Sequence, residues 1–235
     1  MNFHAHGWKS SRQSEWLTAD MEPESIEDYY DRVAAATDAE GRLPVAIEEM
    51  PGWDIFPFEL DGLRIKPLEP LQDVEPPREG EDAADCSCRQ PMPPERAAQV
   101  AWRNERWLLV ALDMKLPVSF ILRPVEHFDI ADLPDDLAAE MGLLIVRVTA
   151  AVEELPSVGR CHVGRYGDGG AHAHPFFFGR PARMGQLRGS CLLDWEENLP
   201  PVPEDVRRAN AGHVGRRLVE RLGGEGPAWE GRTTV

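Results

Sequence analysis

The sequence lacks the features that mark membrane and secreted proteins. Its most apolar stretch, Met141 to Val148, is far shorter than the roughly 20 residues that a membrane span needs, and it contains Arg147. The N-terminus has no apolar signal-peptide core. Four cysteines in 235 residues are too few for a disulfide scaffold. These absences predict a cytoplasmic protein without disulfide bridges.

Basic residues are also scarce. The chain has 25 lysines and arginines against 41 acidic residues, for a formal net charge of −16. Binding to bulk nucleic acid needs a broad positive surface, so that class of partner is not expected, and neither is a membrane. A small nucleotide remains a candidate ligand, because one phosphate group needs only a local positive pocket.

The chain divides by composition near residue 84. Residues 1–84 predict an irregular, proline-rich N-terminal extension with a short helix at Tyr29 to Ala36, and Asp73 to Asp85 is typical of an exposed acidic linker. Residues 85–235 predict a folded domain that ends in a helix. The core that such a chain can bury is ample.

The folded part shows alternating strand and helix patterns. Trp107 to Leu112 and Val118 to Leu122 predict buried strands, and a hairpin is predicted between Arg160 and Phe178. A helix is expected from Pro134 to about Glu154, and another from Pro203 to Gly223. Short connections within each strand pair predict an α+β fold, an antiparallel meander with helices packed on it.

The window from Arg160 to Arg188 reverses the sign of the chain's charge. It contains five arginines and only one carboxylate, Asp168. Guanidinium groups suit phosphate because they present several donors in a planar fork. The window therefore predicts an anion site, and the alternative is a solvated hairpin with scattered surface arginines.

Two histidines follow a glycine-rich turn in this window. The turn is Gly167 to Gly170, and His172 and His174 follow it. In an extended strand, residues i and i+2 face the same way, so both rings are expected on one face. The pattern favours histidine chemistry inside the anion site. The alternative is a pair of strand histidines that face solvent.

This constellation resembles the histidine-triad superfamily of nucleotide hydrolases and transferases. Its hallmark is His-x-His-x-His after a turn of the form Gly-x-x-x-x-His. Gly167 to His172 fits the turn, and His172-Ala173-His174 fits the first two thirds of the triad. Pro124 to His127 is similar to the upstream histidine turn, and Arg180 to Trp195 resembles the tail of an actinobacterial-type branch. The resemblance covers roughly residues 86–200.

Two positions depart from the family pattern. Phe176 stands at the third triad position, and Gly169 replaces a serine of the turn that often donates to phosphate. A residue other than histidine at the third position also occurs in the hexose-1-phosphate uridylyltransferases of this superfamily. The departure leaves two readings open: an active hydrolase or transferase, or a nucleotide-binding protein with weak or no turnover.

The resemblance implies roles for individual residues. His174 would attack the α-phosphate as the nucleophile, with His172 beside it as the other catalytic histidine. Backbone N–H groups of Gly169, Gly170 and Ala171 would bind the phosphate oxygens.

Side chains around the triad complete the implied nucleotide site. Arg165, Arg180 or Arg188 would offset the charge of the transition state. Phe176 would form a wall of the nucleobase pocket or belong to the core.

The resemblance also implies a structural zinc site and a homodimer. The corresponding ligands are Cys86, Cys88, His127 and His172, a set that suits tetrahedral Zn²⁺. The usual spacing is Cys-x-x-Cys, whereas here only Ser87 separates the cysteines. Two free thiols beside a linker are the alternative. A zinc-stabilised scaffold whose N-terminal arm contacts a partner is a third reading of the whole chain.

Overall fold

A computed structural model of the chain describes residues 34–42, 67, 70–196 and 199–229. Its contacts separate two compact units, and the unit that includes residues 74–235 contains the whole sheet and both long helices. Most of the proline-rich extension lies outside the described residues, as does the predicted helix at Tyr29 to Ala36 except for residues 34–36. The fold described below is that of the sheet-containing unit.

The centre of this unit is a five-stranded sheet in the order β1-β2-β3-β5-β4, with every pair antiparallel. The strands are β1 (Val100–Arg103), β2 (Trp107–Ala111), β3 (Ser119–Pro124), β4 (Val158–Gly164) and β5 (Phe176–Pro181). The antiparallel α+β prediction is confirmed. Two details are new: β1 was not predicted, and the chain crosses to the edge strand β4 before β5 returns to pair with β3.

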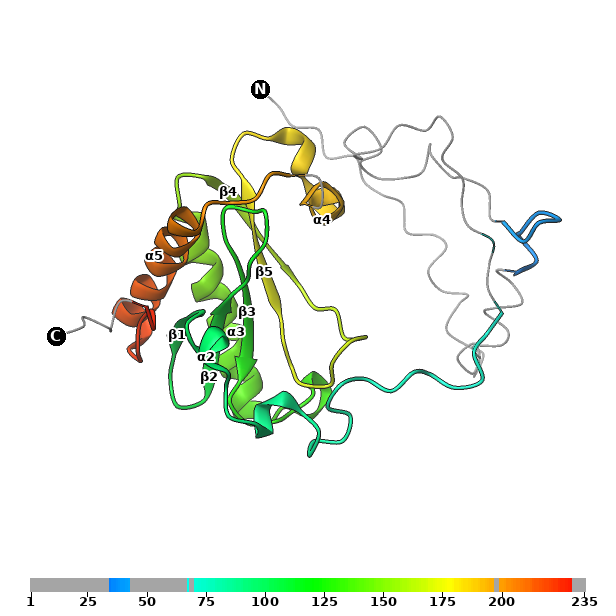
Figure 1. Ribbon diagram of the computed structural model, residues 1–235, viewed down its shortest axis with the longest axis horizontal. Helices are drawn as coiled ribbons and strands as arrows, with labels where there is room; N and C mark the ends of the chain where they lie inside the picture. The colour runs from blue at the N-terminus through cyan, green and yellow to red at the C-terminus, as the bar shows by residue number, and fades with distance from the viewer. Residues whose placement is uncertain (1–33, 43–66, 68–69, 197–198, 230–235) are drawn as a thin grey trace, which may run out of the picture. The chain divides into compact units, whose positions relative to one another are not determined.

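Two long helices cover one face of the sheet (Figure 1). They are α3 (Asp135–Glu153) and α5 (Glu204–Leu222), close to the predicted bounds. Each begins directly after a proline and has acidic residues in its first turn, where they interact favourably with the helix dipole. Within the described ranges, no helix combines the length and the apolarity that crossing a membrane requires.

Alternation along the strands divides side chains between the two sheet faces. Phe120 and Phe177 are fully buried in the core beneath α3 and α5. Their neighbours Ile121, Phe176 and Phe178 point to the opposite face. Among the described residues, only short segments, which include α4 (Leu192–Glu196) and α2 (Pro94–Ala97), cover part of this side, which we call the open face. The described part of the chain therefore leaves one sheet face available for a site.

Gly215 sets how closely α5 approaches the sheet. A Cβ atom added at this position would overlap the carbonyl oxygen of Ala101 in the neighbouring β1 segment. We expect Gly215→Ala to lower the free energy of unfolding by about 2 kcal/mol or more, because backbone must move to relieve the overlap. Urea unfolding would measure this change.

The matched control is Gly142→Ala on α3. No heavy atom lies within 4 Å of a Cβ at Gly142. Alanine should therefore stabilise the protein there by roughly 0.5–1 kcal/mol through helix propensity. Equal effects at the two positions would contradict the close approach at Gly215.

Candidate active site

His174 lies in the loop that leads into β5, beside the open face. Its Nδ1 forms a hydrogen bond with the carbonyl oxygen of His172. A carbonyl can only accept, so Nδ1 carries the proton and Nε2 keeps its lone pair. The ring is half-buried and meets Phe176 edge to face, with 5.5 Å between the ring centroids. This tautomer presents an unprotonated nitrogen as a potential nucleophile.

His172 turns to a different set of partners. It is buried, and its Nε2 donates to the carbonyl oxygen of Pro124 at 2.9 Å. Its Nδ1, which must then be unprotonated, lies 3.5 Å from Sγ of Cys86. Burial, aided by the charge of Arg123, lowers the pKa of His172 to about 4, so the ring is neutral at pH 7. The rings of the two histidines thus have different hydrogen-bond partners.

The loop placement also corrects one expectation. The second strand of the hairpin was predicted to include both histidines, but β5 begins only at Phe176. The N–H of Ala173 donates to Phe128 at 2.7 Å, so the chain around His172 pairs with the loop after β3. That pairing directs His172 toward Cys86. His174 lies at the end of the loop, two residues before β5.

The predicted metal ligands form a cluster of two thiols and two imidazoles. The ligand atoms of Cys86, Cys88, His127 and His172 all lie within 4.8 Å of one another. Sγ of Cys88 is 3.6 Å from Nδ1 of His127, and the Cys86–His172 contact is 3.5 Å. Zinc at about 2.3 Å from sulfur and 2.0 Å from nitrogen has tetrahedral S···N edges of about 3.6 Å. The donor set and its spacing fit zinc.

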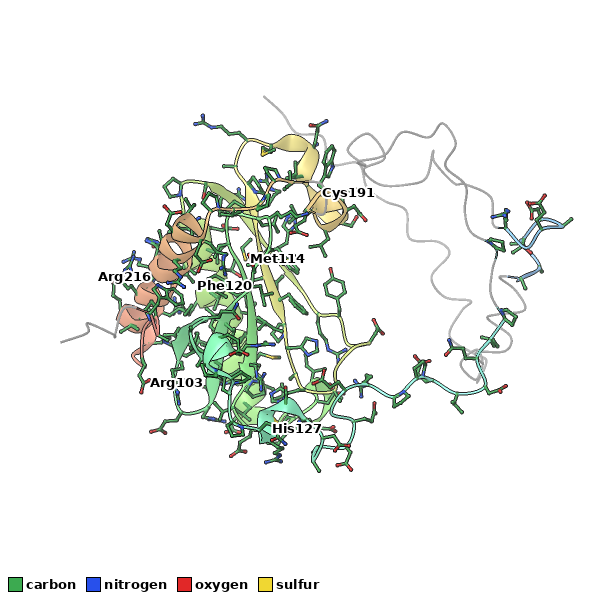
Figure 2. The ribbon with its side chains drawn as sticks, viewed as in Figure 1. Arg103, Met114, Phe120, His127, Cys191 and Arg216 are labelled. Carbon is green, nitrogen blue, oxygen red and sulfur yellow. The ribbon has the colours of Figure 1, made fainter. Side chains whose placement is uncertain are left out.

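The short Cys-Ser-Cys spacing is compatible with this cluster. Cys86 caps the 3-10 turn Ser87–Arg89, and the N–H of Cys88 donates to Sγ of Cys86 at 3.5 Å. The tight turn brings both thiols to the same side. Figure 2 shows His127 near the end of the sheet where the cluster lies, and Cys191 toward the opposite end. The thiols outside the cluster thus belong to another region.

Cys161 belongs to β4 rather than to the metal cluster. Burial raises the pKa of its thiol to about 12. It therefore stays protonated at pH 7 and is a poor metal ligand. This thiol is structural.

The glycine-rich turn is paired with the segment that precedes the cysteines. The N–H of Glu79 donates to Gly169 at 3.1 Å, and the N–H of Ala171 donates to Glu79 at 2.9 Å. The predicted exposed linker is therefore docked at this point. The Ala171 donor, expected to bind phosphate, is already engaged, whereas no hydrogen bond in the described part of the chain uses the N–H of Gly169 or Gly170.

Arg165 lies beside this turn and is held by a carboxylate. Asp129 accepts from Arg165 at 3.1 Å and from Arg78 at 2.8 Å. Burial raises the pKa of Asp129, but the hydrogen bonds from Arg78 and the N–H of Ile130 outweigh this and hold it below its usual range. Arg78 also pairs with Glu81 at 3.1 Å, so two guanidinium groups are matched here by two carboxylates. Sequence analysis missed Arg78 because it lies in the predicted linker.

The other two arginines expected at the phosphate have different surroundings. Arg180 donates to the carbonyl oxygen of Pro181 at 2.9 Å. It lies four residues beyond Phe176 on β5, roughly 13 Å along the strand. Arg188 is exposed and donates to Gly185 at 2.8 Å. The described contacts do not bring either guanidinium to the glycine turn.

Arg123 is a further candidate for the arginine beside His174, because the strand register places it opposite that histidine. The β3–β5 pairs include Ile121 with Phe176, and the N–H of Leu122 donates to Pro175 at 2.9 Å. Continued by one residue, this register places Arg123 opposite His174 on the open face. The alternation of side chains along β3 could have indicated this placement from the sequence. It puts Leu122 in the core and its neighbour Arg123 on the opposite face of the sheet.

An aromatic cleft lies on the other flank of His174. The ring of Phe176 stacks on Phe178, with 5.7 Å between centroids and 7° between planes. Phe178 in turn lines a cleft of about 400 Å³. The other main side chains of this cleft are His162, Tyr166, Ser190, Leu192 and Leu193. Its lining suits a flat ring.

The sequence matches no protein-family profile and no protein of curated function. Solved structures do resemble this fold. One is titled a hypothetical histidine triad nucleotide-binding protein of Sulfolobus tokodaii, and it is 13% identical to this chain with a TM-score of 0.40. The match covers 53% of this chain and 88% of that one. A histidine triad protein of Marinobacter aquaeolei has 18% identity, TM-score 0.40 and coverages of 56% and 97%.

A third structure, titled a zinc-bound histidine triad family protein of Mycobacterium smegmatis, has 18% identity and a TM-score of 0.37. The match covers 50% of this chain and 84% of that one. All three are histidine-triad proteins. The likeness spans about half of the present chain.

Proposed function

We propose that the protein is a nucleotidyl hydrolase or transferase of the histidine-triad type. Its substrate is a nucleotide phosphoanhydride or phosphoramidate, and Nε2 of His174 is the nucleophile. The observation that carries this proposal is the hydrogen bond from Nδ1 of His174 to the His172 carbonyl, which leaves Nε2 unprotonated. A neutral imidazole in this tautomer is a good nucleophile near pH 7.

The reaction is a double displacement at phosphorus. In the first step the Nε2–P bond forms, and the bond from phosphorus to the leaving group breaks with its electron pair going to the leaving atom. In the second step water or an acceptor hydroxyl attacks the same phosphorus, loses its proton to solvent and releases His174. The His172 carbonyl binds Nδ1–H throughout and stabilises the positive charge of the phosphorylated ring.

The remaining site residues bind the nucleotide. The N–H groups of Gly169 and Gly170 and the guanidinium group of Arg165 supply donors for non-bridging oxygens. The ion pair with Asp129 holds Arg165 beside the glycine turn. The aromatic cleft beyond Phe176 receives the nucleobase by stacking.

Zinc, in this proposal, is structural. Cys86, Cys88, His127 and His172 would hold it, and these four ligands leave no open coordination position for catalysis. The bond from His172 to Pro124 orients the ring for coordination, as is usual for metal-bound histidines. Through these four ligands a bound zinc ion would secure the loop whose carbonyl orients His174.

Intact-mass analysis tests the proposal. After brief mixing with diadenosine tetraphosphate, the protein should gain the mass of one adenylyl group, and peptide mapping should locate it on His174. Saturable binding of the nucleotide with neither adduct nor product would instead support the alternative, a nucleotide-binding protein without turnover. The docked Ala171 and the phenylalanine at the third triad position are the features that favour this alternative.

A further inference from the structure

A second cleft of the open face is lined by arginines. It measures about 290 Å³ and lies beside the metal cluster, with Cys88 in its wall. Arg96 from α2, Arg103 from β1 and Arg123 from β3 line it, above the apolar side chain of Leu108. No carboxylate is present among the described residues that form its wall. In a chain of net charge −16, this cleft is a local concentration of positive charge.

These guanidinium groups have few partners within the protein. In the described part of the chain, neither Arg96 nor Arg123 forms an ion pair, and the only pair of Arg103 is a 3.7 Å contact with the largely exposed Glu225. The Nε atom of Arg123 is buried without a hydrogen-bond acceptor. A buried donor without a partner is destabilising, and an anionic ligand would supply the missing acceptor.

One cross-strand row of residues connects the cleft with His174. Arg103 pairs with Leu108, and Leu108 pairs with Arg123. The register discussed above adds His174 to the same cross-strand row. Neighbouring strands are about 4.8 Å apart, so this row leads from His174 directly into the arginine cleft. A group that extends from phosphorus at His174 therefore meets guanidinium groups on this side.

Phe176, at the third triad position, restricts which leaving groups can depart from the phosphorus atom. Phe176 has no proton to donate, and its ring packs against His174. An amine must be protonated before it leaves phosphorus, whereas a phosphate or polyphosphate leaves as a stable anion and needs no acid beside it. The site lacks the donor that a phosphoramidate would need at this position and has the positive charge that an anionic leaving group needs.

We infer that the arginine cleft binds an anionic polyphosphate leaving group, so that the substrates are phosphoanhydrides rather than phosphoramidates. This inference rests on the proposed function. When the P–O bond breaks, its electron pair stays on the bridging oxygen, and the guanidinium groups of Arg123, Arg103 and Arg96 stabilise the resulting charge along the departing chain. Arg123 acts nearest to the reacting phosphorus, and the other two arginines act further along.

The test uses Arg96→Ala combined with Arg103→Ala, which leaves Arg123 beside His174. Both side chains are exposed, so the fold should be retained, and thermal unfolding would verify this. Arg147→Ala, at an exposed position on α3, is the matched control. Calorimetry with inorganic tripolyphosphate should show at least about tenfold weaker binding to the double variant and unchanged binding to the control.

Kinetics then assigns the bound anion to the leaving group. The wild-type protein should prefer diadenosine tetraphosphate to adenosine 5′-phosphoramidate by about 100-fold or more in kcat/KM. The double variant should lose at least about tenfold of that preference, because only the anhydride uses the cleft.

The two proposals fail in different ways. An unchanged tripolyphosphate affinity, or an unchanged substrate preference in a double variant that still forms the adduct, would overturn the leaving-group assignment and leave the proposed function intact. If no protein forms an adduct but the double variant binds tripolyphosphate more weakly, the proposed function fails. The leaving-group assignment fails with it, and the cleft is then an anion site only.

Discussion

Replacing His174 with alanine is expected to abolish the adenylyl adduct and to lower turnover of diadenosine tetraphosphate by at least about 10³-fold. Alanine has no nucleophilic nitrogen, and direct attack by water would lack the two-step pathway. The fold should survive, because the ring is half-buried and its hydrogen bond is to the adjacent loop backbone. Intact mass and steady-state kinetics measure the two effects.

His213→Ala serves as the control for this experiment. His213 lies on α5, on the helix-covered side of the sheet, with Nε2 3.6 Å from Glu154. Its replacement should change turnover by less than about twofold, since it has no contact with the site. Adduct formation that persists in His174→Ala would refute the assignment of the nucleophile, whatever the control shows.

Removal of the metal is expected to have the largest effect on stability. The cluster joins three segments that are distant in sequence: the turn at Cys86 and Cys88, the loop after β3 with His127, and the loop before β5 with His172. A site that is saturated about 1,000-fold above its Kd adds about 4 kcal/mol. For a domain of this size, that energy corresponds to a fall in Tm of about 10 °C on chelation or in Cys86→Ser.

Metal analysis provides the control and the decisive comparison. Purified wild-type protein should contain one zinc ion per chain, Cys86→Ser should contain much less, and Cys161→Ser should retain it, because Cys161 lies on β4 outside the cluster. Wild-type protein that is stable without bound zinc, and whose Tm does not respond to a chelator, would show that the cluster is not a structural metal site.

The coupling between the two sites follows from one hydrogen bond. His172 would bind the metal through Nδ1, and its backbone carbonyl orients His174. The proposed metal ligand and the proposed nucleophile are therefore two residues apart along the chain but would serve separate purposes. The sequence predicts His172 and His174 as one feature because they are only two residues apart. In the structure, His172 contacts Cys86, whereas the ring of His174 bonds to the loop backbone.

The arginines show where prediction from the sequence stopped. Five of them lie between Arg160 and Arg188, and proximity along the chain made them the natural candidates for phosphate binding. Arg165 remains a candidate, since it lies beside the glycine turn. Arg180 and Arg188 contact Pro181 and Gly185 instead, whereas Arg123, far away in sequence, lies opposite His174 when the register of β3 with β5 is extended.

The local sequence by itself determined the two long helices, the buried strands and the histidine pair. Helix periodicity, proline positions and apolar strand content act over a few residues, so they can be recognised without the fold. Only the tertiary structure decided the strand order, the docking of Glu79 on the glycine turn and the pairing of β3 with β5. These features depend on hydrogen bonds between segments that are distant in sequence, and no local pattern specifies which segments will pair.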